Sequence, residues 1–355
     1  MTLKPMIWAK QTIMLWKESV SWEWMTTSTN NVLFPKISWN LEPKTTFVSD
    51  DAAHWTIVQS FAERLVDAYT DITLNGNLSF TNVRTLIAAL TWSDWWTWWN
   101  TYTLVNNNTH PTYVITQVTW DYLENWWEIE IYSAAYSAMN TFWITANTND
   151  FVKFDTNFLG SKPEEVTTTN LVNRIKSQLA SEQARDTSAN TIDFSQIKMY
   201  LWEAASVTAF NNAIDWYNDW EHDIDPTLAP LNISSLSLNF NKNVEQVGQI
   251  WTYAKEAYNK QFSIDWSFEK LKFQDSFNYE DNVNKDLMMR IDFYDLNKTE
   301  IVFSILLGKV NLTEKTTSDW VWDLVSENIT FKWLFSWVQA ETLIIDTTNL
   351  SSYES

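Results

Sequence analysis

Polar and apolar residues alternate along much of the chain, and this period of two restricts the fold more than any other feature. In residues 72–80, ITLNGNLSF, apolar side chains fall on one face of an extended strand and polar ones on the other. Comparable alternation predicts strands over residues 112–119, 127–132, 150–158, 235–240, 262–268, 287–294 and 300–307. We therefore expect a mainly β protein, with two tandem β-sandwich or partly closed barrel halves and a few short helices.

Two segments carry helical spacing instead. TNVRTLIAAL (81–90) places its apolar residues on one helix face, and Asn82 is suited to cap the N-terminus. A second helix is expected within residues 164–187, which are polar and poor in strand-forming residues. Residues 36–59 contain turn-forming residues but alternate poorly, so we expect a long excursion from the first sheet there.

The length of 355 residues favours two domains, since single cores seldom grow beyond about 250–300 residues. The segments LNGNLSF (74–80) and IDWSFEK (264–270) share an order of polar and apolar residues, so Gly76 aligns with Trp266. This match indicates a distant internal repeat. The expected division is a first β half over 1–165, a connecting helical or loop segment over 166–192 and a second β half over 193–355.

Tryptophan occurs where turns normally need glycine. TWSDWWTWWN (91–100) holds five tryptophans among turn-forming residues, although a Cβ clashes at turn positions with positive φ. The chain has 24 Trp and only 4 Gly, whereas glycine usually makes up about 7% of a protein. Trp also follows Asp or Asn in ENWW (124–127), YNDWEHDID (217–225), SIDWSF (263–268) and TSDWVWD (317–323). We infer that most of these tryptophans are glycines encoded by UGA, a codon that some bacterial lineages and their phages read as glycine.

Charge and composition exclude several classes of protein. With 44 acidic and 24 basic residues, the formal net charge is −20, which argues against nucleic-acid binding. The absence of cysteine excludes disulfides, thiol nucleophiles and thiolate metal sites. We recognise no signal peptide and no apolar run of about 18 residues, so we expect neither secretion nor membrane insertion.

No catalytic fingerprint is present, whether Trp is taken literally or as Gly. Nucleophile-elbow, Walker, dinucleotide-binding and zincin patterns are all missing, and no carboxylate pair is singled out for glycoside hydrolysis. The densest acidic cluster is DWYNDWEHDID (215–225), but an EF-hand beginning at Asp215 would have Pro226 at its twelfth position. We therefore expect that the protein is not an enzyme and binds no cofactor. We expect residues 215–225 to form an acidic loop. A weak metal-site candidate remains: Asp215, Asp219, Asp223 and Asp225.

With Trp taken as Gly, residues 72–160 resemble the tail tube (major tail) protein of long-tailed bacteriophages. The likeness lies in the order of ITLNGNLSFT, NVRTLIAALT, WSDWWTWWN, YTLVNNNTHPTYVITQV and WWEIEIYSAAYSAMNTFWITANTNDFVKFDTNFLGSK. The later segments ISSLSLNFNKNVEQV and KQFSIDWSFEKLKFQDSFNYEDNVNKDLMMRIDFYD are similar to the repeated sandwich of the longer members.

The resemblance implies a virion structural protein, made in the host bacterial cytoplasm, whose hexameric rings stack into a channel for DNA passage. Its partners would be further copies of itself and other tail proteins, such as the tape measure and the tail terminator, without tight nucleic-acid binding. By position, the excursion at residues 41–60 would reach the neighbouring ring, which gives four candidate contact residues: Lys44, Asp50, Asp51 and His54.

The main alternative is a carbohydrate-binding or adhesin-type β-sandwich with genuine surface tryptophans, because indole rings form rigid platforms for sugars. A secreted glycosidase is a poorer alternative, since it lacks both a signal peptide and an assignable carboxylate pair.

Sequencing the gene tests the glycine interpretation. We expect UGA at most of the 24 Trp codons, including those of Trp95, Trp96, Trp98 and Trp99. A majority of UGG codons would contradict recoding and favour the carbohydrate-binding alternative. In the literal chain, we expect indoles to stand exposed on turns.

Overall fold

The computed structural model describes residues 9–17, 31–35, 43–49, 63–91, 101–103, 113–121, 129–182, 191–219, 229–249, 252–259, 262–271, 277–318, 325–334, 343–347 and 349, and structural statements refer to these. The first strands are β1 (Ala9–Lys17), β2 (Asn31–Pro35), β3 (Pro43–Ser49), β4 (Glu63–Asn77), β5 (Thr101–Thr103), β6 (Tyr113–Asp121), β7 (Ile129–Asn147), β8 (Lys153–Ser161) and β9 (Glu164–Glu165). The later strands are β10 (Ile197–Trp202), β11 (Ile233–Asn241), β12 (Val244–Gln249), β13 (Thr252–Asn259), β14 (Ser263–Leu271), β15 (Leu287–Tyr294), β16 (Ile301–Ser318), β17 (Ser326–Trp333) and β18 (Leu343–Asp346). The helices are α1 (Phe80–Thr91), α2 (Thr169–Glu182), α3 (Val207–Asp219), α4 (Tyr279–Asn282) and the short 3₁₀ helix η2 (Phe194–Gln196).

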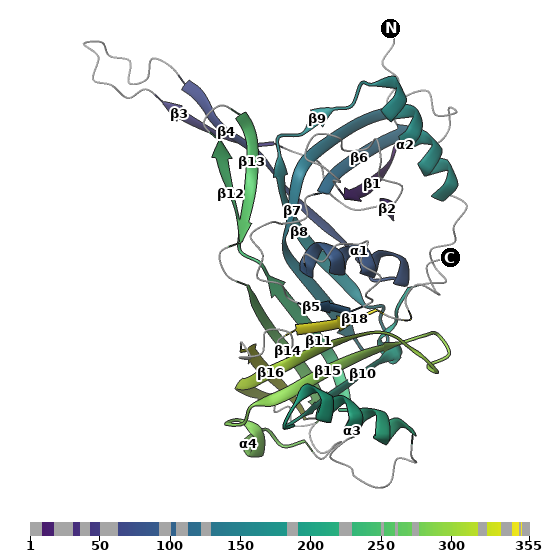
Figure 1. The fold of residues 1–355 in the computed structure, drawn as a ribbon, viewed down its shortest axis with the longest axis vertical. Helices are drawn as coiled ribbons and strands as arrows, with labels where there is room; N and C mark the ends of the chain where they lie inside the picture. The colour runs from purple at the N-terminus through teal and green to yellow at the C-terminus, as the bar shows by residue number, and fades with distance from the viewer. Residues whose placement is uncertain are drawn as a thin grey trace, which may run out of the picture.

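The mainly β fold expected from the alternation is confirmed. Sixteen strands belong to one sheet, while β12 and β13 form a separate two-stranded ribbon (Figure 1). The described strands do not close into a barrel. All the strand pairs of the large sheet are antiparallel, as expected for a chain that connects successive strands by hairpins.

Strand β7 joins the two parts of this sheet. Its first half pairs with β6 and β9, and its second half pairs with β8 and β11. Between them the strand bends, with a positive φ of 50° at Tyr136 and a register shift between Met139 and Thr141. β6, β1 and β2 therefore diverge from the β8 and β11 layer, and α1 lies between the two layers (Figure 1).

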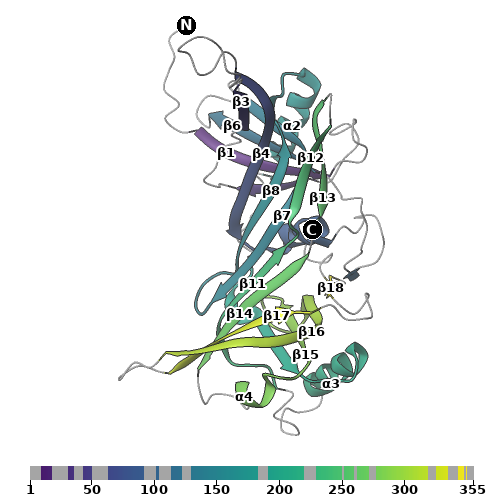
Figure 2. The same ribbon diagram turned by 90° about the vertical axis from the view of Figure 1, so that its left-hand side faces the viewer.

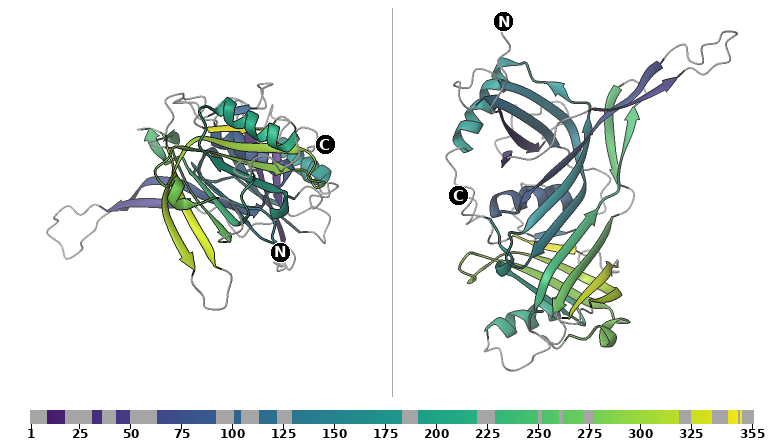
Figure 3. Two further views of the ribbon diagram at one scale, coloured as in Figure 1. Left: turned by 90° about the horizontal axis from the view of Figure 1, so that it is seen from below. Right: turned by 180° about the vertical axis from the view of Figure 1, so that it is seen from behind.

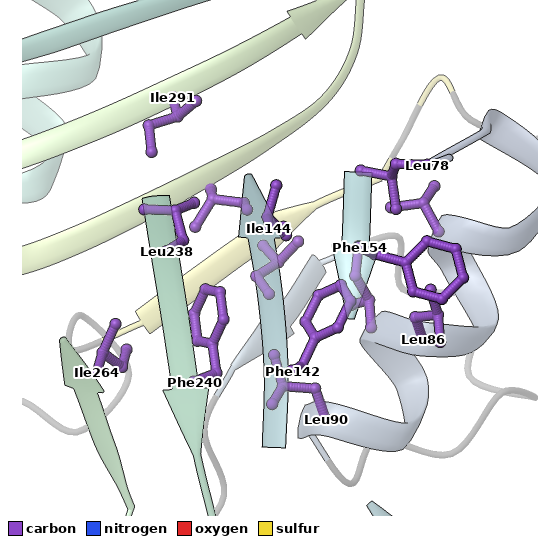
Figure 4. Packing of buried hydrophobic residues seen from close by; sticks show 14 of the residues in the cluster. Leu78, Leu86, Leu90, Phe142, Ile144, Phe154, Leu238, Phe240, Ile264 and Ile291 are labelled. Carbon is purple, nitrogen blue, oxygen red and sulfur yellow. The ribbon is translucent and has the colours of Figure 1, made fainter. Parts of the chain in front are cut away.

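The core lies on the inner face of the strand order β4, β8, β7, β11, β14 and β17. Phe142 of β7 faces Phe240 of β11 across the strand pair, with stacked rings 6.0 Å apart. Leu86 and Leu90 of α1 lie over this face, and Ile291 of β15 covers it further along (Figure 4). One apolar cluster thus continues from β1 to β18, and burying these side chains supplies the main driving force for folding.

The two expected helices are confirmed, but the predicted cap of the first is wrong. α1 begins after Ser79, whose hydroxyl accepts from the Asn82 N–H, while the Asn82 side chain accepts from the Ser79 N–H at 2.9 Å. Asn82 is thus the third helical residue of a reciprocal capping arrangement and Ser79 is the cap. α2 lies within residues 164–187, as expected.

One local prediction needs correction. The acidic segment 215–225 was expected to be a loop, but Asp215 and Asp219 belong to the last turns of α3. The helix forms because Val207, Phe210 and Ile214 pack on one side against β10 and β16, and this tertiary contact outweighs the weak helix propensity of Asn and Asp. The excursion at 36–59 contains β3, which pairs with β4 in spite of its poor alternation.

The halves predicted as 1–165 and 193–355 are joined by the pairing of β7 with β11. Their division by 166–192 stays a prediction, as does their internal repeat. The two residues aligned by the repeat have similar neighbours across the sheet. Gly76 lies across from Phe154 of β8, and Trp266 lies across from Phe331 of β17.

The seam between β7 and β11 gives a stability prediction. We expect Phe240→Ala to lower the free energy of unfolding by about 3–5 kcal/mol, because it removes a fully buried ring and leaves a cavity. Ser237→Ala, on the opposite face of the same strand, should change it by less than about 0.5 kcal/mol. Urea unfolding measures both, and equal losses would contradict the packing described.

Candidate assembly surfaces

The described residues hold no cluster of three or more metal-ligating side chains. Asp215 and Asp219 belong to the last turns of α3, while Asp223 and Asp225 fall outside the described residues. The weak metal-site prediction thus stays a prediction. None of the described helices has the length and apolar character needed to cross a membrane.

The most prominent surface feature is a two-stranded arm made of β3 and the first half of β4. β3 pairs with Glu63–Thr70 on one edge of β4, and β8 pairs with Tyr69–Asn77 on the other. Because these pairings overlap only at Tyr69 and Thr70, the arm extends past the end of β8 and projects from the body (Figures 1 and 3).

The arm coincides with the predicted inter-ring excursion. Lys44 lies in β3, across from Tyr69. Asp50, Asp51 and His54 lie outside the described residues, between the two strands of the arm in sequence. Their expected contact with a neighbouring ring stays a prediction.

The base of the arm is held by close packing beside the bend of β7. The Thr70 hydroxyl is buried and donates to the Ser161 carbonyl at 2.7 Å. Gly160 is across from Thr70, and a Cβ at Gly160 would lie 2.3 Å from the Ser137 Oγ of β7. A larger residue there would require the Ser137 hydroxyl to move, so glycine allows β7 and β8 to approach closely beside the start of the arm.

A second projection is the ribbon of β12 and β13, which prolongs the hairpin of β11 and β14. Two hydrogen bonds to Asn140 of β7 hold its base. The backbone N–H of Lys242 donates to the Asn140 backbone carbonyl at 2.8 Å, and the backbone N–H of Val244 donates to the Asn140 side-chain oxygen at 2.9 Å. Asn243 has a positive φ of 50°, a conformation that Asn tolerates better than most residues. The bend of β7 therefore also sets the exit of this ribbon.

Lys242 anchors the same base from inside. Its side chain is fully buried, and its ammonium donates to the Ala89 carbonyl in the last turn of α1 at 2.9 Å. The negative end of the helix dipole favours a cation at this place. Burial lowers the pKa of Lys242 well below its usual range.

A third projection, formed by β16 and β17, has charged groups at its base. Lys270 of β14 is buried, lies 3.8 Å from the Glu327 carboxylate, and donates to the Phe277 carbonyl at 2.7 Å. Lys315 lies 4.0 Å from the same carboxylate and also pairs with Glu280, which raises the pKa of Lys315. These contacts tie β14, β16, β17 and α4 together where the hairpin leaves the core.

The outer face of the large sheet is polar. One row crosses seven neighbouring strands through residues that are paired in register: Asn75, Asp155, Trp143, Asn239, Asp265, Lys332 and Asn311. Figure 2 looks onto this face, and α1, α2 and α3 lie behind or beside it. Trp143 is 43% exposed and is a large apolar side chain in the middle of the row. Partial burial raises the pKa of its neighbour Asp155.

Sequence reasoning missed the buried charges at the bases of the projections. The sequence did contain a signal for them. Lys242, Lys270 and Glu327 each lie two residues from a buried apolar residue, at a position where the alternation predicts another inward-facing apolar side chain. The neighbouring apolar residues are Phe240, Phe268 and Ile329, respectively. A charge in that phase must find a partner in the core. The identity of the partners depended on tertiary structure.

Comparisons with known proteins give limited likenesses. No protein-family model and no curated protein matches the chain. A chain of the sheath/tube terminator of an extracellular contractile injection system, PVC, is 12% identical with a TM-score of 0.31, over 43% of this chain and 95% of that one. A chain of the PVC sheath–tube complex is 13% identical with a TM-score of 0.30, over 51% and 99%. A chain of the anti-feeding prophage tube-terminating cap is 14% identical with a TM-score of 0.26, over 34% and 83%. All three TM-scores are below 0.5, so these likenesses carry no conclusion about the function of this chain.

The charged base of the third projection gives a prediction. Lys270→Ala should lower the free energy of unfolding by about 3–5 kcal/mol, because it leaves Glu327 buried without its closest cation. The double variant Lys270→Met with Glu327→Leu should recover most of that loss. Chemical denaturation of the two variants and the parent measures the effect. A double variant less stable than Lys270→Ala would contradict the arrangement.

Proposed function

We propose that the chain is the protomer of a phage tail tube, a structural and not a catalytic protein. The observation that carries the proposal is the projecting arm of β3 and β4, which occurs where the resemblance places a contact between rings. The order of strand, helix and strands in residues 72–160 supports the same assignment. Hexameric rings, the tape measure and the tail terminator as partners, and a place in the virion belong to this proposal.

Open strand edges support self-assembly. Among the described strands, Asn311–Ser318 of β16 has β17 on one edge and no strand on the other. Among the same described strands, residues 72–77 of β4 have β8 on one edge and no strand on the other. Exposed edges expose unpaired backbone groups, and pairing with identical copies covers them. Two different edges on one protomer suit a head-to-tail contact, which closes into a ring when the rotation per copy permits.

Two tryptophans in the large sheet bear on the glycine interpretation. Trp266 is only 5% exposed, contrary to the expectation of exposed indoles, but its Nε1 is buried with no hydrogen-bond partner among the described residues. Trp143 lies across from Asn239, whose Oδ1 is also buried and has no such partner. Both polar atoms incur a desolvation cost. Trp266 also packs on Phe331 within the main core, however, so the glycine interpretation stays a prediction. Trp95, Trp96, Trp98 and Trp99 lie outside the described residues.

Electron microscopy tests the function on the glycine-coded protein, in which each UGA codon is translated as glycine. We expect rings or tubes at high concentration in negative stain, because edge pairing is driven by mass action. A strict monomer at high concentration would overturn the assignment.

Duplex DNA provides an independent test. We expect binding weaker than about 10⁻⁶ M even at low salt, since each phosphate contact needs a cation and the protomer carries a net charge of −20. A titration that gives tighter binding would contradict a channel through which DNA slides.

Shortening the arm separates ring formation from stacking. We expect that replacing residues 48–64 by Asn-Gly, a favoured two-residue hairpin turn, leaves a folded protomer that still forms rings. These rings should no longer stack into tubes. Circular dichroism checks folding, and negative-stain images compare the shortened protein with the full chain. Tubes of unchanged length would contradict the proposed role of the arm.

A second candidate function is sugar binding at Trp143. A half-exposed indole beside Asp155 and Asn239 has the apolar and polar groups that a carbohydrate platform uses. If Trp143 is genuine, soluble oligosaccharides should quench its fluorescence, and Trp143→Ala should abolish the quenching. Absence of any quenching would exclude this alternative at that site.

A further inference from the structure

Asn140 is an extra residue in β7, at the bend of that strand. Met139 and Thr141 on either side of it pair with the consecutive residues Phe158 and Asn157 of β8, so Asn140 has no place in that ladder. A bulge of this kind bends a strand and redirects a side chain. The Asn140 amide is therefore available for contacts between strands that the regular pairing does not join.

The Asn140 and Asn157 amides join β12, β7, β8 and β4 in one chain of hydrogen bonds. The Val244 N–H donates to Asn140 Oδ1 at 2.9 Å, and Asn140 Nδ2 donates to Asn157 Oδ1 at 3.3 Å. Asn157 Nδ2 in turn donates to the Asp71 carboxylate of β4. Each amide accepts at its oxygen and donates from its nitrogen toward the carboxylate, so the bonds are aligned and polarise one another. We call this chain of Val244, Asn140, Asn157 and Asp71 the polar link.

The two ends of the polar link lie at the bases of two projections. Asp71 directly follows Thr70, the last residue of β4 that pairs with β3, so it lies where the arm leaves the body. Val244 is the first residue of β12 and lies where the ribbon begins. The arm and the ribbon extend from the same side of the body (Figures 1 and 3). The polar link therefore spans the distance between their starting points.

Apolar packing alone fixes the direction of the ribbon weakly. Val244 packs with Ala138 of β7 and Leu159 of β8 in a small cluster that is separate from the main core. Apolar stabilisation grows with buried area, so three side chains of this size offer little resistance to a change of angle. A two-stranded ribbon also has little stability of its own. Its direction therefore depends on the polar contacts at its base.

The base of the ribbon has two polar anchors. The Lys242 ammonium donates to the Ala89 carbonyl and ties the base to α1. The Val244 N–H ties it to the arm through the polar link. Of these two anchors, the second one reaches the arm. We therefore expect its loss to release the angle between the projections while the ribbon stays attached to α1.

We propose that the polar link couples the arm to the ribbon, so that the two projections keep one relative angle and move as a unit. The coupling is a property of the single protomer and goes beyond the proposed tube function, since it holds whether or not copies assemble. It also has a consequence for assembly. A neighbouring copy that orders the arm orders the ribbon as well, so a second contact at the ribbon costs less conformational entropy than it would alone.

Distances between spin labels test the coupling, and the absence of cysteine in the full chain makes the labelling specific. Thr46→Cys places one label on β3 of the arm, and Glu256→Cys places the other on β13 of the ribbon. Double electron–electron resonance should give a single narrow distance distribution in this labelled parent. Adding Asn157→Ala should broaden the distribution, because it removes the amide that joins Asn140 to Asp71.

Two controls separate the polar link from a general weakening of the sheet. Asn75→Ala removes an exposed amide from β4 and should leave the arm-to-ribbon distribution narrow. Labels at Thr73→Cys and Ser237→Cys report on β4 and β11 within the body, and their distance distribution should stay narrow in every variant.

Asp71 gives a second route to the same test, which also serves if Asn157→Ala does not fold. Asp71→Ala should broaden the arm-to-ribbon distribution, whereas Asp71→Asn keeps an acceptor oxygen and should preserve it. Combining Asp71→Ala with Asn157→Ala should broaden the distribution no further than one of them alone, because both interrupt the same chain of hydrogen bonds.

The contrary results are distinct. An arm-to-ribbon distribution that stays narrow in both Asn157→Ala and Asp71→Ala would overturn the coupling. Equal broadening of the distance within the body would also overturn it, since Asn157 would then stabilise the sheet as a whole. A broad distribution in the labelled parent, or further broadening in the combined variant, would do the same. Rings or tubes formed in spite of such a result would leave the proposed function standing.

Discussion

The structure depends on the hydrogen-bonded pairing of one long strand, β7, with four others. Its first half holds β6 and β9 and its second half holds β8 and β11, so every route through the large sheet from β1 to β10 crosses it. The bend near Tyr136 and Asn140 directs the two halves of the strand into different layers, and α1 fills the space between them. The same bend provides the Asn140 groups that position Lys242 and Val244, so it also determines where β12 and β13 leave the body.

The projections share a physical plan. Each has buried polar groups with partners beside it: Thr70 for the arm of β3 and β4, Lys242 for β12 and β13, and Lys270 with Glu327 for β16 and β17. Buried ion pairs add little net stability compared with apolar packing, but they penalise alternative arrangements strongly. A protomer that must present long ribbons in fixed directions to identical neighbours benefits from such specificity, which agrees with the proposed assembly.

Much of the strand content followed from the sequence, because alternation reports directly on a half-buried sheet. Residues 235–240 and 287–294 illustrate this, and α1 was predicted to within a residue at each end. The strand predicted over 72–80 ends at Asn77, because Phe80 already begins α1. The failures have physical causes. The cap of α1 was assigned to Asn82 because Ser79 also fits the preceding strand pattern, and α3 forms through packing on β10 and β16 that local propensity cannot reveal. β7 was predicted only to residue 132, since the period of two breaks at its bend. Which face of the sheet would stay open depended on the positions of α1 and β15, and the charges at the bases of the projections needed partners distant in sequence.

The central claim is that identical copies of this protein form rings that stack into a tube. A cryo-EM reconstruction of the concentrated, glycine-coded protein tests it most directly. The account predicts stacked rings in which the open edge of β16 contacts a neighbouring copy and the arm of β3 and β4 contacts the next ring. An isolated protomer, or an assembly in which the arm contacts no other copy, would contradict it.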